Sequence, residues 1–265
     1  MPPLELPLGL GTSGLDDPAE CTATVTAALE AGYRHVDTAQ MYDNEAAVGE
    51  GVAAADVDRD DVVVATKIHP ENLAPEDARK TARESLDRLG LDRVDLLYVH
   101  WPTRAYDAEA TLPVFDDLRD AGLTDHVGVS NFTPELLREA RAVLDAPIAA
   151  HQVECHPRLQ QRELRDLAAE FDHRLVGYSP LARGDLFDDE EFRGVAERAD
   201  RSPAVLALAW ALARGIAPIP KATGDHVAEN LGALDADVDR SVFDEIDALE
   251  PGDRRIDPDD AAWNR

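Results

Sequence analysis

The sequence is poor in cysteine and in long apolar runs, and each shortage narrows what the protein can be. Its two cysteines, Cys21 and Cys155, are too few for a disulfide framework or a four-thiolate metal site, so we expect both to be free buried thiols. No stretch approaches the ~20 apolar residues that a membrane span needs. The amino-terminal MPPLELPLGL lacks a charged leader followed by a long apolar run. These absences predict a cytoplasmic protein without a membrane segment.

Positive charge is also scarce. The 265 residues include 54 acidic and 26 basic side chains, which gives a formal net charge of −28. No basic stripe offsets this charge, so we expect no partnership with nucleic acid or with an anionic membrane surface. The acids are spread along the chain rather than gathered in a tail, a pattern typical of halophilic proteins that stay hydrated in concentrated salt. We therefore expect a requirement for molar salt, and a monomer or weak oligomer.

Lysine is nearly absent from the chain. The three lysines are Lys67, Lys80 and Lys221, and the first and last of them end apolar runs. An ammonium at the end of a buried strand is costly unless it meets a counter-charge. The sequence therefore indicates a specific use for the ammonium groups of Lys67 and Lys221.

Short apolar runs alternate with helical patterns along the whole chain. Each run is bounded by Gly, Pro, Asn or Asp and is predicted as a strand. The eight strand candidates are Leu8–Gly11, Arg34–Thr38, Val62–Lys67, Val94–His100, His126–Ser130, Ala149–Val153, Leu175–Ser179 and Ala217–Lys221. This alternation predicts an α/β protein, a (β/α)8 TIM barrel that forms a single domain over residues 1–265. The stretch Ala182–Ser202 is expected to be an irregular insertion.

An open doubly wound sheet is the alternative architecture. Gly9, Gly11 and Gly14 match the spacing of a G-x-G-x-x-G dinucleotide fingerprint. No helix is expected to open directly after them, as that fingerprint requires. The barrel is therefore the preferred prediction.

Four reactive side chains lie at or next to the carboxyl ends of predicted strands, where barrel enzymes place their active sites. A phenol has an ordinary pKa of ~10, which a neighbouring ammonium lowers, and a carboxylate holds that ammonium charged. An imidazole can orient a carbonyl oxygen. Each residue alone has a structural explanation, such as a turn cap, a loop aromatic or a core histidine. Together they predict a catalytic group in which the phenol of Tyr42 is the general acid and Lys67 and Asp37 adjust its pKa. His100 orients the carbonyl, so the four predicted catalytic residues are Asp37, Tyr42, Lys67 and His100.

Five ordered segments carry a family resemblance: GYRHVDTAQMYDNEAAVG, HVGVSNF, HQVECHP, VGYSPLARG and PIPKAT. With these segments the chain resembles the aldo-keto reductases over nearly its full length. The resemblance implies a (β/α)8 barrel that reduces aldehydes and ketones with a nicotinamide cofactor. It also implies that Asp37, Tyr42, Lys67 and His100 form the catalytic tetrad.

The same resemblance implies a set of cofactor contacts. Ser130, Asn131 and Gln152 would hold the nicotinamide carboxamide, and Tyr178 would stack on its ring. The remaining implied contacts, from the ring and ribose through the pyrophosphate to the adenosine end, are Gly11, Thr12, Ser13, Ser179, Leu181, Lys221, Thr223, Glu229 and Asn230. His226 stands where the family usually has an arginine for the 2′-phosphate. Lys221 and His226 would favour that phosphate less firmly than lysine with arginine, so NADP(H) is the expected cofactor and use of NAD(H) is also possible.

The substrate side is expected to be simple. The chain ends soon after its last helical segment, which by the same resemblance favours an open pocket for small carbonyl compounds, with Trp101 and Trp263 as apolar walls. Trp101 could equally be barrel packing. No metal site is expected.

Two other functions remain open. His100, His151 and His156 with Asp37 could belong to a metal-dependent hydrolase on the same barrel, although their spacing is poor for a shared metal. A non-catalytic protein that binds the dinucleotide and reports redox state is the second alternative. Stoichiometric zinc in the purified protein would support the hydrolase. Cofactor binding without turnover of any carbonyl compound would support the redox sensor.

Overall fold

The computed structural model describes residues 4, 6 and 8–264. Its eight strands form one parallel sheet in the order β1 to β8. Backbone hydrogen bonds from Gly9 N to Pro218 O (2.9 Å) and from Gly11 N to Pro220 O (3.0 Å) join the first and last strands. The predicted (β/α)8 barrel is thus confirmed. The strands are β1 (Leu10–Gly11), β2 (His35–Asp37), β3 (Val63–Ile68), β4 (Val94–Val99), β5 (Thr124–Ser130), β6 (Ile148–Glu154), β7 (Arg174–Tyr178) and β8 (Ile216–Ile219).

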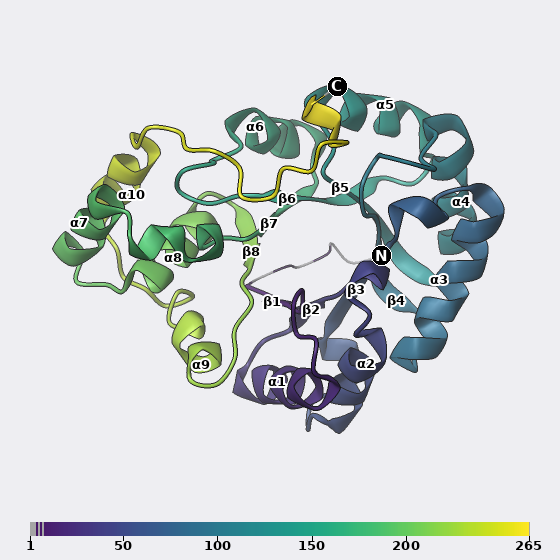
Figure 1. Ribbon diagram of the computed structural model, residues 1–265, viewed down its shortest axis with the longest axis horizontal. Coiled ribbons are helices and arrows are strands. Elements are labelled where there is room, and N and C mark those ends of the chain that lie inside the picture. Colours follow the sequence, from purple (N-terminus) through teal and green to yellow (C-terminus); the bar gives the residue numbers. More distant parts are fainter. Residues whose placement is uncertain (1–3, 5, 7, 265) are drawn as a thin grey trace.

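The helices surround the sheet on its outside (Figure 1). Several begin with proline after a capping side chain: Asp17, Thr133 and Ser202 each accept a hydrogen bond from a backbone N–H in the first turn. The helices are α1 (Pro18–Ala31), α2 (Glu45–Ala54), α3 (Pro75–Leu89), α4 (Ala108–Asp120), α5 (Pro134–Val143), α6 (Arg162–Phe171), α7 (Glu190–Arg198), α8 (Pro203–Ala213), α9 (His226–Leu231) and α10 (Arg240–Asp247). Short 3-10 helices are η1 (Gln40–Tyr42), η2 (Arg59–Asp61), η3 (Pro70–Asn72), η4 (Ala182–Phe187) and η5 (Ala262–Asn264).

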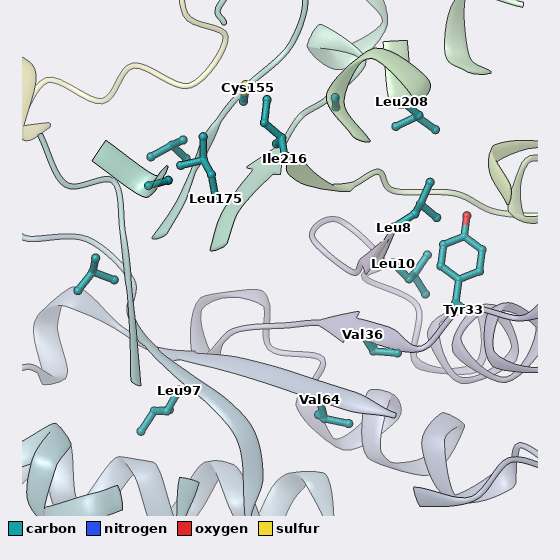
Figure 2. Close-up of a cluster of buried hydrophobic side chains, with 14 of the residues drawn as sticks. Leu8, Leu10, Tyr33, Val36, Val64, Leu97, Cys155, Leu175, Leu208 and Ile216 are labelled. Atoms are coloured by element: carbon teal, nitrogen blue, oxygen red, sulfur yellow. The ribbon is translucent and has the colours of Figure 1, made fainter. Parts of the chain in front are cut away.

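Alternation along the strands divides the core into two parts. Val36, Val64 and Leu97, from three successive strands, belong to the apolar layer between the sheet and the helices (Figure 2). A second, smaller apolar cluster includes Ala65 and Tyr98, whose positions alternate with those of that layer. Asp37 follows Val36 by one residue, and Lys67 follows Ala65 by two residues. Both side chains therefore point to the inside of the barrel, at the carboxyl ends of their strands.

The close approach of β1 to β8 depends on a missing side chain. A Cβ atom at Gly11 would lie only 2.7 Å from the carbonyl oxygen of Ile219, too close for any other residue without a shift of the backbone. Glycine at this position therefore permits the barrel to close directly beneath the cavity described below.

The expectation of an irregular insertion over Ala182–Ser202 was wrong. The segment contains η4 and the helix α7, which Asp189 caps through the Phe192 N–H and which buries Phe192, Val195 and Ala196. The apolar spacing of this helix spans only about two turns, too short to distinguish it from a loop by sequence pattern.

Cys21 and Cys155 are free and buried, as expected. Within the described part of the chain, no helix is both long enough and apolar enough to cross a bilayer. After α10 the chain turns back over the barrel toward α5 (Figure 1). Glu154, the last residue of β6, fixes this segment by accepting hydrogen bonds from Arg255 N (2.7 Å) and Ile256 N (3.0 Å).

Candidate active site

A cavity of about 630 Å³ lies at the carboxyl ends of the strands. Its walls come from segments far apart in sequence: the ends of β1, β2 and β5 to β8, the loops after β4 and β7, and the carboxyl-terminal segment. Asp37, Tyr42 and His100 line it, and Lys67 lies buried behind them. The structure thus brings the four predicted reactive side chains to one place.

Lys67 is the centre of this group. Its Nζ donates hydrogen bonds to the Asp37 carboxylate and to the carbonyl oxygen of Thr38 (2.9 Å). The same ammonium lies 3.4 Å from the hydroxyl of Tyr42. The side chains of Lys67 and Asp37 are 0% and 2% exposed, so their ion pair is shielded from solvent.

The electrostatics of this group differ from the sequence-based expectation. Burial acts to lower the pKa of Lys67, but the Asp37 carboxylate and Tyr42 act in the opposite direction, and the net pKa is raised. For Tyr42, burial raises the pKa by more than the Lys67 ammonium lowers it. The expected acidic phenol is therefore not found in this state, and Tyr42 keeps its proton at neutral pH. The ammonium remains charged and is positioned to stabilise a phenolate.

His100 stands beside the phenol. The Tyr42 and His100 rings are 5.7 Å apart and nearly perpendicular. Burial, followed by the charge of Lys67, holds the pKa of His100 well below its ordinary value, so the imidazole is neutral at physiological pH. A neutral imidazole can donate or accept a hydrogen bond without adding charge to the cavity.

Amide and hydroxyl groups lie next to the reactive side chains. Asn131, which has a left-handed backbone (φ 63°), donates from Nδ2 to the carbonyl of His100 (3.0 Å) and to Ser130 Oγ (3.1 Å). Its Oδ1 accepts from the Tyr178 hydroxyl (2.8 Å). Gln152 donates from Nε2 to Asp37 Oδ2 (2.7 Å), a contact that the sequence did not indicate. Asp37 is therefore held by Lys67 on one oxygen and by Gln152 on the other.

Most of the residues assigned to the cofactor from sequence line the same cavity, but not all. Those that do are Gly11, Ser13, Ser130, Asn131, Gln152, Tyr178, Ser179, Leu181 and Lys221. Thr12 is buried and bonds to the carbonyl oxygen of Asp37 (3.0 Å). Thr223, His226, Glu229 and Asn230 lie outside the lining; His226 Nδ1 is 3.1 Å from Glu229 Oε2, and Asn230 is buried in α9.

Several lining residues were not anticipated from sequence. They are Gly14, Met41, Pro180, Arg183, Gly184, Phe187, Ile219, Pro220 and Ile256. Arg183 lies in the quoted segment VGYSPLARG, so its position after a barrel strand was an available signal. Ile256 carried no such signal, because its place depends on the contact of the tail with Glu154.

Trp101 lines the cavity and packs against Trp263, with ring centroids 5.7 Å apart. Trp263 itself lines a second, smaller cavity of about 280 Å³, together with Arg254. Of the two tryptophans expected as pocket walls, Trp101 thus faces the main cavity directly and Trp263 supports it from behind.

The histidines that suggested a hydrolase do not form a ligand set. His156 Nε2 lies 3.1 Å from Glu154 Oε1, while the His151 ring lies 6.1 Å from that of His173. Among residues 4, 6 and 8–264, no group of three or more His, Cys, Asp or Glu side chains could hold a metal ion. The hydrolase alternative has no donor set in this part of the chain.

Comparison with known proteins decides the family. Residues 7–251 match the model of the aldo/keto reductase family. The chain belongs to this family. This aldo-keto reductase is an oxidoreductase that acts on carbonyl compounds, and members of the family use nicotinamide cofactors.

Curated and solved relatives agree with this assignment. The reductase is 39% identical to the methylglyoxal reductase DkgB of Salmonella typhi over 258 residues, which cover 96% of each chain. It is 35% identical to the glyoxal reductase of Bacillus subtilis, with 96% of this chain and 92% of that protein covered. The crystal structure of an aldo-keto reductase enzyme from a Medee basin deep-sea metagenome library superposes with a TM-score of 0.90 at 31% identity, covering 95% and 94% of the two chains.

Proposed function

We propose that this aldo-keto reductase reduces small aldehydes and ketones to alcohols, with Tyr42 as the proton donor to the carbonyl oxygen. The observation that carries the proposal is the Tyr42 hydroxyl, 3.4 Å from a buried ammonium and beside a neutral imidazole, in one cavity. A nicotinamide cofactor held in this cavity would supply the hydride for the carbonyl carbon.

The chain's own residues then have distinct tasks. Tyr42 and His100 donate hydrogen bonds to the substrate oxygen and orient it within the cavity. Because the pKa of Tyr42 is raised, its proton is available until negative charge develops on that oxygen. Lys67 then stabilises the phenolate that proton transfer leaves behind, and Asp37 keeps Lys67 charged.

The lining of the cavity fits a dinucleotide. Ser130, Asn131 and Gln152 offer hydroxyl and amide groups suited to a carboxamide, and the Tyr178 ring provides an aromatic face. Lys221 and Arg183 line the same cavity, and among residues 4, 6 and 8–264 neither forms an ion pair with an acidic side chain. In a chain with a net charge of −28, two such cations suit the phosphates of a dinucleotide.

We propose NADP(H) as the preferred cofactor, with NAD(H) also used. A Cβ atom at Gly14 would lie 3.3 Å from the Lys221 Nζ, which places this ammonium over the loop after β1. His226, which takes the position of the family's arginine, is 74% exposed and lies beside Glu229 rather than in the cavity lining. Lys221 would therefore carry most of the interaction with a 2′-phosphate. A single ammonium gives a weaker preference than a lysine with an arginine.

The substrate class follows from the walls and from the relatives. Trp101, Met41 and Ile256 are apolar side chains in the same cavity as Tyr42. Two relatives carry the names methylglyoxal reductase and glyoxal reductase. We therefore propose small dicarbonyl and monocarbonyl compounds as substrates.

A turnover assay over a panel of carbonyl compounds tests the proposal. Loss of reduced nicotinamide absorbance is followed with NADPH or NADH in the presence of methylglyoxal, glyoxal and larger aldehydes. We expect turnover of the small compounds with both cofactors and a higher kcat/KM with NADPH. Cofactor binding without turnover of any compound would instead support the redox-sensing alternative.

We also propose that folding requires high salt. With 54 acidic against 26 basic residues, self-repulsion opposes the folded state in dilute buffer, and salt screens it. Unfolding midpoints in dilute buffer and in concentrated KCl test this; equal midpoints would contradict it.

A further inference from the structure

The proposed proton donor lies on a short turn with an exposed residue at its centre. Tyr42 is the last residue of η1, a 3-10 turn of three residues. Its neighbour Met41 is 40% exposed, and Asp43 has a left-handed backbone (φ 53°). The contact of the Tyr42 hydroxyl with Lys67 is long, at 3.4 Å. The position of the phenol therefore depends on the turn as well as on its contacts with Lys67 and His100.

Gln40, the first residue of this turn, uses its complete hydrogen-bonding capacity. A glutamine amide has two N–H donors and two acceptor lone pairs. From Nε2, Gln40 donates to the carbonyl oxygen of Thr81 (3.1 Å) and to Ser85 Oγ (3.0 Å). Its Oε1 accepts from His69 N (2.9 Å) and from Asn72 Nδ2 (3.0 Å). One side chain thus connects the turn to α3 and to both ends of η3.

These contacts link the proton donor to the strand that carries its ammonium. His69 follows β3 directly, two residues after Lys67. Gln40 precedes Tyr42 by two residues in the same turn. A rigid connection between Gln40 and His69 therefore restricts the distance between the Tyr42 hydroxyl and the Lys67 ammonium.

We infer that Gln40 is a positioning residue for catalysis: its amide holds the η1 turn so that Tyr42 faces both Lys67 and the substrate oxygen. Gln40 does not line the cavity and touches no reacting atom. The inference rests on the proposed role of Tyr42. It goes beyond that role, because it assigns the placement of the phenol to a side chain outside the site.

The test is a double-mutant cycle between Gln40→Ala and Tyr42→Phe. Misplacement of a reacting group by about 1 Å costs on the order of 10²-fold in rate. We therefore expect Gln40→Ala to lower kcat by about 10- to 100-fold while the Kd for NADPH stays within about twofold of wild type. In the Tyr42→Phe background, where the phenol is already absent, the same substitution should change the residual single-turnover rate by less than about twofold.

The contacts on α3 supply matched controls. Thr81 offers its backbone carbonyl, so Thr81→Ala keeps that contact and should leave kcat unchanged. Ser85→Ala removes one of the four contacts and should lower kcat by a smaller factor than Gln40→Ala. Asn72→Ala removes another of the four contacts, the one to Gln40 Oε1, and should likewise lower kcat by a smaller factor than Gln40→Ala. These two milder variants keep the test valid if Gln40→Ala does not fold.

Three results would overturn the inference. They are a kcat for Gln40→Ala within twofold of wild type, an equal loss of rate in both backgrounds, and a loss confined to cofactor affinity. These results differ from a failure of the proposed function itself. In that case Tyr42→Phe alone would retain its activity, whatever the effect of Gln40→Ala.

Discussion

Lys67 and Asp37 form an ion pair from which solvent is almost completely excluded, with side chains 0% and 2% exposed. Such a pair contributes little net stability, because desolvation of the two charges offsets their attraction. Removing one partner is different, since it leaves an uncompensated charge in the core. Because stability does not require this pair, its presence in a chain with only three lysines supports the proposed catalytic role of the ammonium.

Lys67→Met should therefore impair both activity and stability. We expect kcat to fall by about 10²-fold or more, because the phenolate of Tyr42 loses its counter-charge. The free energy of unfolding should fall by about 3–5 kcal/mol, because the Asp37 carboxylate is left buried without its cation. Steady-state kinetics and denaturant unfolding measure the two effects. The double variant Lys67→Met with Asp37→Asn should recover much of the stability and none of the activity; recovery of activity would contradict the assigned role.

Lys221→Ala should change the cofactor preference. Loss of the ammonium should raise the KM for NADPH by about tenfold, equivalent to about 1.4 kcal/mol, and should affect NADH much less. Lys80→Ala is the matched control, because the Lys80 side chain is 72% exposed and lies 3.6 Å from Glu84 on α3, outside the cavity. An equal rise in KM for both cofactors would place Lys221 at a phosphate that they share.

The buried histidine His151 predicts a loss of stability in mild acid. Burial, followed by the nearby His173, lowers the pKa of His151 to about 3, whereas an unfolded histidine takes up its proton near pH ~6.5. Between these values the unfolded state binds more protons, so stability falls as the pH falls. By pH ~5 this one group should cost about 2 kcal/mol relative to neutral pH.

His151→Asn isolates this contribution from the other titrating groups. The difference in unfolding free energy between wild type and variant should shrink by about 2 kcal/mol from pH ~7 to pH ~5. A difference that is the same at both pH values would show that His151 is not held neutral.

Local patterns in the sequence were sufficient to predict the barrel and the gathering of Asp37, Tyr42, Lys67 and His100 at one end of it. Asp37 and Lys67 end runs that read clearly as strands, and parallel strand ends meet at one face of a barrel. For that reason the structure places Asp37 in the lining of the cavity and Lys67 directly behind it. The helix α7 was missed, because two turns of apolar spacing give too weak a signal next to the 3-10 turn η4.

Other features depend on contacts between distant segments and carried no local signal. Gln40 meets partners 29 to 45 residues away, and Ile256 reaches the cavity through Glu154, 102 residues before it. The pKa of Tyr42 was predicted in the wrong direction for a related reason. Sequence showed the neighbouring cation but not the extent of burial, and burial has the larger effect.

The kinetics of Tyr42→Phe test the central claim most directly. The substitution removes the phenolic proton and keeps the ring against His100. We predict that kcat for methylglyoxal with NADPH falls by about 10³-fold or more, while the Kd for NADPH stays within about twofold of wild type. A variant that retained wild-type kcat would show that the proton reaches the carbonyl oxygen from another group.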